Sequence, residues 1–399
     1  MDGISASAQA VPSAIPSERD ASAPAAWPAF LLALAATSIA VGLIWDISWH
    51  STVGRDAFWT PAHIAIYLGG LVGGCVGGWL AIKQTFLDAA GQRAAGVSVF
   101  GARAPLGAWV AMWGAIAMLT SAPFDDWWHN AYGLDVKIVS PPHALLGFGM
   151  FGISVGALLL ALARQNRLPD GAGGGLFIYV GGIFLTLGGV FVTEYTLPNL
   201  QHAALFYKVA ALMFAFRLVA LGYAGRVSWS ATRVAAVYLG VECLMIWILP
   251  LFPAQPRLAP IFNPVTHMVP PAFPLLLIFP ALAIDFVLRR AGEAGGWLRR
   301  IALALALGAI FLAVFMGVQW FFAEFLLSPR ANNWFFAGNR FWTYGAGAGA
   351  WRSRFWHLDP TEAEADLLGV SSVVVSWALA SFSAWVGLLW GGWMRKVKR

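Results

Sequence analysis

The composition of this chain of 399 residues excludes a water-soluble globular protein. Hydrophobic residues account for 59% of it and charged residues for only 11%, whereas an ordinary soluble domain is about 25% charged. The net charge of +6 does not indicate a nucleic-acid partner, because membrane proteins normally gather basic residues on their cytoplasmic side. We therefore expect a protein whose surroundings are the lipid bilayer, with no nucleic acid bound.

Ten apolar stretches follow the N-terminal segment, and each is long enough to cross a hydrocarbon core of about 30 Å. Backbone polar groups in lipid must be hydrogen-bonded within their own segment, so each stretch predicts a helix. The expected fold class is all-α, a polytopic transmembrane helix bundle of about ten helices in five outward-pointing hairpins. The expected helices cover roughly residues 28–49, 62–82, 105–124, 142–163, 174–193, 202–224, 231–252, 268–288, 298–327 and 367–394.

The basic residues predict the orientation of these helices. Sixteen of the 25 Lys and Arg residues fall in the N-terminal segment, in the loops after helices 2, 4, 6 and 8, and at the C-terminus, whereas seven fall in the opposite loops. Because cytoplasmic loops carry the excess of Lys and Arg, we expect both termini in the cytoplasm. In a bacterium this would be a multi-pass protein of the inner (cytoplasmic) membrane, with the opposite loops on the periplasmic side.

Two of the outward hairpins share one pattern, which indicates an internal repeat. Each has an acid, an aromatic-rich turn, a His, a Gly-x-Asp, and then a Pro and a second His at the start of the return helix. The two sequences are WDISWHSTVGRDAFWTPAHIAIYLGG, which begins at Trp45, and FDDWWHNAYGLDVKIVSPPHALLGFG, which begins at Phe124.

In the first hairpin Asp46 and His50 stand four residues apart, which places them on one face at the outer end of a helix. His63 follows thirteen residues later. Pro61 suits the first turn of the return helix, because its missing N–H costs nothing there. We therefore expect His63 at the outer end of that helix, facing Asp46 and His50.

The second hairpin repeats this arrangement, with Asp125 and His129 four residues apart and His143 fourteen residues further on. Asp126 is an alternative to Asp125 as the carboxylate of this set, but only Asp125 keeps the four-residue spacing to His129. Each hairpin is thus expected to bring one carboxylate and two imidazoles together.

Two imidazoles and one carboxylate form a ligand set that suits copper, zinc or iron. The chain has only seven histidines, and four of them fall in these two sets. The two cysteines lie in apolar stretches, so a disulfide framework or a Cys-based zinc site is not expected. Asp56 and Asp135 are candidates to orient the imidazole rings, and the alternative is that they only cap or solvate their loops.

The stretch Asp46-Ile-Ser-Trp-His50, then Arg55-Asp56, then Trp59-Thr60-Pro61-Ala62-His63 and Tyr67, resembles the C subunit of the copper membrane monooxygenases. These are the particulate methane and ammonia monooxygenases. In that subunit an Asp-x₃-His-x₁₂-His run binds copper within the membrane, and Asp46, His50 and His63 match it.

The same subunit has a second, neighbouring copper site of the form Asn-x₃-His-x₁₃-His. Asp125, His129 and His143 match its spacing, with Asp in place of Asn. The resemblance covers roughly residues 30–160, and the later helices have no counterpart that aligns.

The resemblance implies a membrane-bound copper-dependent monooxygenase, or its metal-binding subunit, that hydroxylates a small apolar substrate with O₂. Partner subunits would supply electrons or a soluble copper domain, because this chain contains no such domain. The alternative is a copper-binding or copper-transport membrane protein without oxidation chemistry. The chain has no outer Met-x-x-Met cluster and no Cys pair, which argues against a soft pathway for Cu(I).

We expect three parts along the chain. Residues 1–26 are rich in Ala, Ser and Pro, lack the features of a secretory signal and form a disordered cytoplasmic tail. Residues 27–165 form a four-helix metal-binding region. Residues 166–399 form a six-helix membrane region of unknown role, whose long outer loop, 328–366, either caps the outer face or is mobile.

Further polar residues occur in the later helices. Glu194, His202 and His267 are each expected at a helix end, where they either line a third site or have a structural role. Lys208 and Glu242 lie within expected helices and could pair inside the bundle. Such a pair would mainly fix the packing of the helices, and we favour this interpretation over the alternative of a proton relay.

Overall fold

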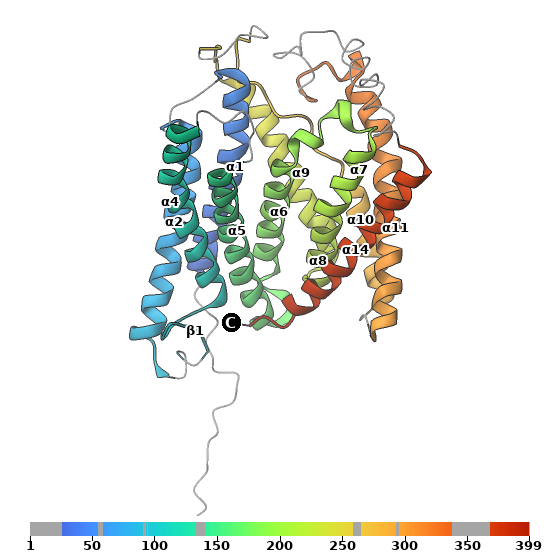
Figure 1. Cartoon of the computed structure of the whole chain (residues 1–399). Coiled ribbons are helices and arrows are strands. Elements are labelled where there is room, and N and C mark those ends of the chain that lie inside the picture. The colour runs from blue at the N-terminus through green and yellow to red at the C-terminus, as the bar shows by residue number, and fades with distance from the viewer. Residues whose placement is uncertain are drawn as a thin grey trace, which may run out of the picture.

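The computed structural model describes residues 26–54, 59–90, 93, 95–132, 140–257, 265–292, 295–336 and 368–398. Within these residues the protein is a bundle of long helices with one small β-hairpin, which confirms the expected all-α membrane fold (Figure 1). Nine of the described helical spans are long and apolar enough to cross a membrane. The expected tail and most of the expected long loop lie outside the described residues.

The first four spans form two helical hairpins that lie side by side (Figure 1). Helix α4 continues eight residues beyond its expected end at 124, although Pro123 lies inside it. Strands β1 (Val97–Val99) and β2 (Ala102–Ala104) connect the hairpins. The four helices are α1 (Trp27–Thr52), α2 (Pro61–Ile82), α4 (Leu106–Tyr132) and α5 (Pro141–Arg167).

Glycines allow α4 and α5 to approach each other closely. A Cβ atom at Gly107 would lie 2.5 Å from the carbonyl oxygen of Gly156, and one at Gly114 would lie 2.7 Å from that of Gly149. Small residues are the usual means of close helix contact in membranes. The second hairpin is therefore held by direct contact between two backbones.

The later spans complete the bundle behind these hairpins. A π-helical turn, Ala211–Ala215, joins α7 to α8 in one continuous span. The helices are α6 (Gly174–Phe191), α7 (Ala204–Ala210), α8 (Phe216–Ala224), α9 (Ser230–Ile248), α10 (Ile278–Ala291), α11 (Trp297–Leu326) and α14 (Val370–Met394).

The prediction of a helix over 268–288 is wrong for its first ten residues. Residues 265–277 are extended rather than helical, and α10 begins only at Ile278. The reason is a run of three prolines, each of which lacks the N–H that a helix interior needs and clashes with the preceding turn. These are Pro270, Pro271 and Pro274.

His267 consequently does not open a helix. It lies in the extended segment, where it forms an isolated β-bridge with Pro253. The remaining helix α10 has 14 residues and spans about 21 Å, which is shorter than a hydrocarbon core of about 30 Å. The eighth stretch predicted as a helix is therefore made of an extended segment followed by a short helix.

Side chains from two other helices hold the extended segment in place. Ser48 Oγ of α1 donates to the carbonyl of Val269 at 2.5 Å, and the Val269 N–H donates to Thr52 Oγ1 at 2.8 Å. The Leu275 N–H donates to the Tyr238 hydroxyl of α9 at 3.2 Å. Non-helical backbone at membrane depth is tolerated where it is buried in protein or lines a cavity, and these contacts meet that requirement.

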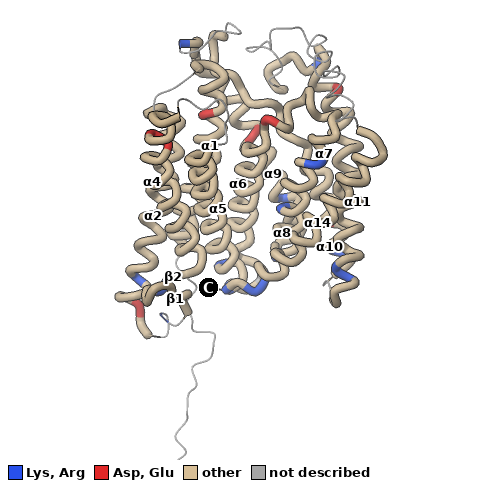
Figure 2. Tube along the Cα trace, viewed as in Figure 1, with Lys and Arg blue, Asp and Glu red and all other residues tan. Residues whose placement is uncertain are grey.

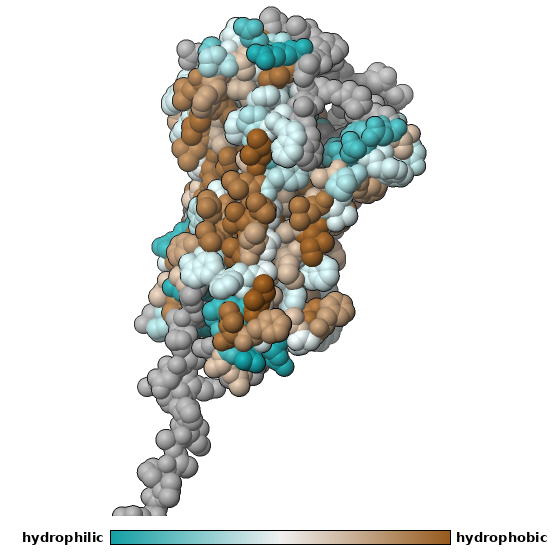
Figure 3. Space-filling model, turned by 90° about the vertical axis from the view of Figure 1, so that its left-hand side faces the viewer, coloured by the Kyte–Doolittle hydropathy of each residue, from teal (hydrophilic) through white to brown (hydrophobic). Residues whose placement is uncertain are grey.

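One cluster of buried apolar side chains joins the early helices to the later ones. It contains Leu32 of α1, Leu158 of α5, Phe177 of α6, Phe311 of α11 and Leu388 of α14, all at most 3% exposed. Hydrophobic side chains also cover much of the outer surface between more hydrophilic ends (Figure 3). The molecule thus has an apolar interior and an apolar outside, as a bilayer-embedded bundle requires.

The described basic residues are distributed unevenly along the bundle. Most of them gather toward the end where the C-terminus lies (Figure 2). This agrees with the asymmetry found in the sequence, and the assignment of that end to the cytoplasm stays a prediction. Lys208 and Glu242, both described, form no ion pair with each other, so the expected pairing is wrong.

Candidate metal centres

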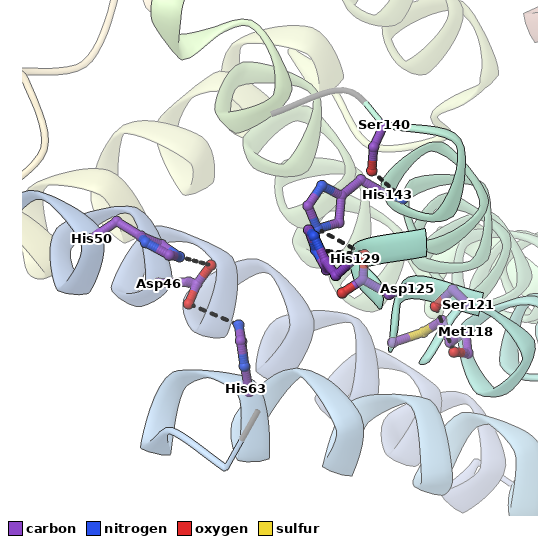
Figure 4. A network of polar contacts seen from close by, with 9 residues as sticks. All are labelled: Asp46, His50, His63, Met118, Ser121, Asp125, His129, Ser140 and His143. Carbon is purple, nitrogen blue, oxygen red and sulfur yellow. Dashed lines mark hydrogen bonds and ion pairs between the residues drawn. The ribbon is translucent and has the colours of Figure 1, made fainter. Parts of the chain in front are cut away.

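The first candidate centre lies where the end of α1 meets the beginning of α2 (Figure 4). His63 Nε2 lies 3.2 Å from Asp46 Oδ1, and His50 Nε2 lies 3.7 Å from Asp46 Oδ2. The Asp46 side chain is 15% exposed, whereas that of His50 is 49% exposed. The carboxylate is therefore sheltered, and the centre opens on the side of His50.

The second candidate centre has the same construction at the end of α4 and the beginning of α5 (Figure 4). His129 Nε2 and His143 Nε2 lie 3.4 Å and 3.5 Å from the same oxygen, Asp125 Oδ1. The continuation of α4 past Pro123 is what keeps Asp125 and His129 one turn apart. All six histidines and aspartates predicted as ligands are thus brought together in two groups of three, as expected.

A hydroxyl-bearing cap places the second histidine of each centre. Thr60 Oγ1 accepts a hydrogen bond from the His63 N–H at 3.2 Å, and Ser140 Oγ accepts one from the His143 N–H at 3.4 Å. In both helices a proline follows the cap and the histidine is the third helical residue. The proline was recognised in the sequence, but the capping role of Thr60 and Ser140 was missed, although Ser or Thr before Pro signals a helix start.

Both aspartates have a buried oxygen that makes no hydrogen bond to any described residue. These atoms are Oδ1 of Asp46 and Oδ1 of Asp125. A buried carboxylate oxygen without a partner is costly. Each of these oxygens faces an imidazole nitrogen at a distance or angle that does not form a hydrogen bond, which leaves room for an ion between them.

The spacing of the ligand atoms fits a metal ion. In each group one atom from every residue lies within 4.8 Å of the others. Ligands about 2.0–2.2 Å from a tetrahedral ion are about 3.3–3.6 Å apart, and the nitrogen–oxygen distances of the second centre fall in this range. The residues therefore fit a three-ligand site with an open coordination position.

The helix ends add to the electrostatics of both centres. The beginnings of α2 and α5 carry the partial positive charge of a helix N-terminus, which favours an ionised carboxylate nearby. Asp46 and Asp125 each face such a terminus across their hairpin.

The two centres are neighbours (Figure 4). The Tyr67 hydroxyl on α2 interacts electrostatically with both Asp125 and Asp46. Tyr67 stands one turn after His63 and belongs to the stretch that carries the resemblance. The Tyr67 side chain therefore lies close enough to both carboxylates to interact with each of them.

The other sequence candidates have different positions. His202 faces Glu324 of α11, with Nε2 3.4 Å from Oε1, and its ring packs edge-on against Trp320 at 4.2 Å. His267 Nδ1 lies 2.9 Å from the Thr266 hydroxyl. Among the described residues no third group of three ligands forms, so Glu194 makes no site with these histidines.

The sequence analysis did not predict the contact between His202 and Glu324, since the two residues are more than 120 positions apart. No local pattern signals such a pairing. Asp56 and Asp135, the candidates for orienting the rings, lie outside the described residues.

Comparison of the chain with protein-family models, with curated proteins and with solved structures gives no match. The likeness to the copper monooxygenase subunit therefore depends on the spacing of the ligands and on the neighbouring residues alone.

Proposed function

We propose that the two centres bind copper and that the protein is a membrane-bound copper-dependent monooxygenase, or the metal-binding subunit of one. The observation that carries this proposal is the pair of aspartates, each with a buried oxygen that makes no hydrogen bond and each lying between two imidazole nitrogens. The nitrogen-rich donor set suits copper, with zinc and iron as alternatives. The motif resemblance selects copper among these.

Each ligand has a distinct part in holding the ion. The four histidines bind through neutral imidazole nitrogens. The caps at Thr60 and Ser140 fix the positions of His63 and His143 in the first turns of their helices. Asp46 and Asp125 offset part of the charge of the ion. Three protein ligands leave a position for a further molecule at each centre.

Copper, when bound, would supply the redox chemistry that activates O₂. One oxygen atom would enter a C–H bond of a small apolar substrate and the other would leave as water, with two electrons and two protons supplied from outside. Partner subunits are the proposed source of the electrons. The apolar surroundings of the bundle favour entry of O₂ and of a lipid-soluble substrate.

We propose the inner membrane of a bacterium as the location, with both termini in the cytoplasm. The centres lie at the end of the bundle opposite the C-terminus (Figures 1 and 4). With the C-terminus inside, the centres face the periplasm. The excess of basic residues near the C-terminus supports this orientation.

Metal analysis of the purified protein in nanodiscs tests the copper assignment. We expect about two copper ions per chain, and one in each of the variants His63→Ala and His143→Ala, because each removes a ligand from one centre only. His202→Ala is the matched control, since it removes a histidine outside both centres, and it should retain both ions. Zinc in place of copper, or no metal, would contradict the proposal.

An activity measurement then separates an enzyme from a copper carrier. The copper-loaded protein is given a chemical reductant, O₂ and a panel of small apolar substrates, and hydroxylated product is measured by mass spectrometry. Product that disappears in His63→Ala or His143→Ala supports a monooxygenase. Full copper loading without product from any substrate, alone or with co-purified partners, would instead favour copper binding or transport.

A further inference from the structure

A small polar cavity lies inside the bundle, apart from the metal centres. Its volume is about 40 Å³, and its walls come from α1, the end of α6, α9 and the extended segment. The α1 residues that line it are Ile44 and Ile47, which are on a different face of that helix from Asp46. A cavity needs about 10–15 Å³ to admit one water, so this one has room for an ion with a water or two.

Glu242 of α9 is the charged residue that lines this cavity. It is 7% exposed, and its carboxylate makes no hydrogen bond and no ion pair with any described residue. Lys208, the partner expected from the sequence, is not bound to it. A buried carboxylate in a membrane bundle is expensive unless a positive charge accompanies it, so Glu242 requires an explanation.

Asp285 is a second buried acid of the same protein, and its carboxylate oxygens have hydrogen-bond donors. It is 4% exposed, and its carboxylate accepts hydrogen bonds from the Ala231 N–H, the Thr232 N–H and the Thr232 hydroxyl at 2.7–3.2 Å. Its negative charge is thus placed at the beginning of α9, where a helix favours it. Glu242 lies near the other end of the same helix and has none of these donors.

The extended segment brings backbone carbonyls without a hydrogen-bond partner among the described residues to the cavity. Five of its residues, 271–275, line the cavity. Pro271 and Pro274 have no N–H, and the N–H of Leu275 is already donated to Tyr238. The carbonyls of residues 271–274 accept no hydrogen bond from the described residues. Carbonyl oxygens beside the Glu242 carboxylate form the kind of oxygen ligand set that hard cations take.

We propose that this cavity is a binding site for a small monovalent cation of the size of Na⁺, with the Glu242 carboxylate as its anionic ligand. Carbonyl oxygens of the segment 271–275 are available as neutral ligands. An unwound segment beside a buried acid is a known way for membrane proteins to hold Na⁺ at membrane depth. The same segment is bonded to α1 through Ser48 and Thr52, so cation binding would also stabilise the end of α1 that carries the first metal centre.

Equilibrium binding of ²²Na⁺ to the full-length protein in nanodiscs of zwitterionic lipid tests this proposal. Choline replaces Na⁺ at constant ionic strength, and the metal centres are first emptied with a chelator. We expect saturable binding of about one Na⁺ per chain. Because a bound ion stabilises the folded state, the thermal unfolding midpoint should rise with Na⁺ concentration, in proportion to the logarithm of the concentration once it exceeds Kd.

Glu242→Gln is the decisive variant, because it removes the charge and keeps the size of the side chain. It should lose saturable ²²Na⁺ binding and the Na⁺-dependent rise of the midpoint. Asp285→Asn is the matched control, since it neutralises a buried acid that already has its partners, and it should bind Na⁺ as the unaltered protein does. The helical circular dichroism of the unaltered protein and a single symmetrical elution peak show that each variant is folded.

Two results would overturn the proposal. One is the absence of saturable Na⁺ binding in the unaltered protein, which needs no variant and means that Glu242 is protonated or hydrated instead. The other is equal Na⁺ binding by the protein and by Glu242→Gln. Neither result depends on the identity of the metal or on oxidation activity, so the copper proposal is tested separately.

Discussion

At the residue scale, each centre depends on two kinds of side chain. Asp46 and Asp125 provide the buried oxygen that faces the histidines, and Thr60 and Ser140 decide where the second histidine lies. In the proposed centres the aspartates would act directly on the ion, whereas the hydroxyls act through the backbone N–H of the histidine. A hydroxyl that never touches the metal can therefore change how well the metal is held.

We expect Thr60→Ala to weaken copper binding at the first centre and Ser140→Ala to weaken it at the second. Loss of such a cap costs about 0.5–2 kcal/mol of stability and releases the first turn of the helix that carries the histidine. Competition with a copper chelator measures the affinity of each centre.

Thr60→Ser is the control for the first of these variants, because it keeps the capping oxygen and should retain the original affinity. If Thr60→Ala binds copper as tightly as Thr60→Ser does, the cap has no role in placing His63.

At the scale of the element, the two hairpins have the same arrangement of helix ends and candidate ligands. One helix ends with an aspartate and a histidine a turn apart, and the next begins with a cap, a proline and a histidine. The separation of the two helices then decides whether the three ligands meet. In the second hairpin this separation depends on glycine contacts between α4 and α5.

We expect Gly107→Ala to destabilise the protein by about 1–3 kcal/mol, since its Cβ would lie 2.5 Å from the backbone oxygen of Gly156. The two helices must shift apart, so copper at the second centre should also be bound more weakly. Thermal unfolding and copper affinity are the two measurements.

Gly78→Ala is the matched control, because a Cβ at Gly78 of α2 would meet no atom within 4 Å. That variant should leave copper binding unchanged and alter stability by less. Equal destabilisation by the two substitutions would show that close packing of α4 on α5 is not what holds the second hairpin.

At the scale of the whole molecule, the later helices are integral to the metal-bearing part. A common apolar core includes α1 and α5 together with α6, α11 and α14, and the extended segment is bonded to the end of α1. The uneven distribution of basic residues predicts which end of this single bundle faces the cytoplasm.

We expect a reporter attached to the C-terminus to report the cytoplasm. A fluorescent protein that matures only in the cytoplasm should be bright there, and alkaline phosphatase, which needs the periplasm, should be inactive. The same reporters inserted after Tyr132, near the second centre, should behave in the opposite way. Phosphatase activity at the C-terminus would reverse the orientation and place the centres on the cytoplasmic side.

The sequence by itself determined the class of the fold, nine of the spans and the two groups of three candidate ligands. Hydrophobic length predicts a helix in lipid because the backbone has no other way to satisfy its polar groups. Helical spacing predicts the ligands because Asp46 and His50 are neighbours on one turn, and a short hairpin brings His63 back to them. Both relations join residues that lie close together in the sequence, so they can be predicted from the sequence alone.

Only the tertiary structure decided what depends on distant residues. The prolines of segment 265–277 prevent a helix where hydropathy alone predicted one. Hydrogen bonds with Ser48, Thr52 and Tyr238 satisfy part of the backbone of that non-helical segment. Likewise Glu242, expected to pair with Lys208, lines a cavity with no basic partner among the described residues. The physical reason is that burial and partnership of a polar group are set by the whole packing, which no spacing along one segment records.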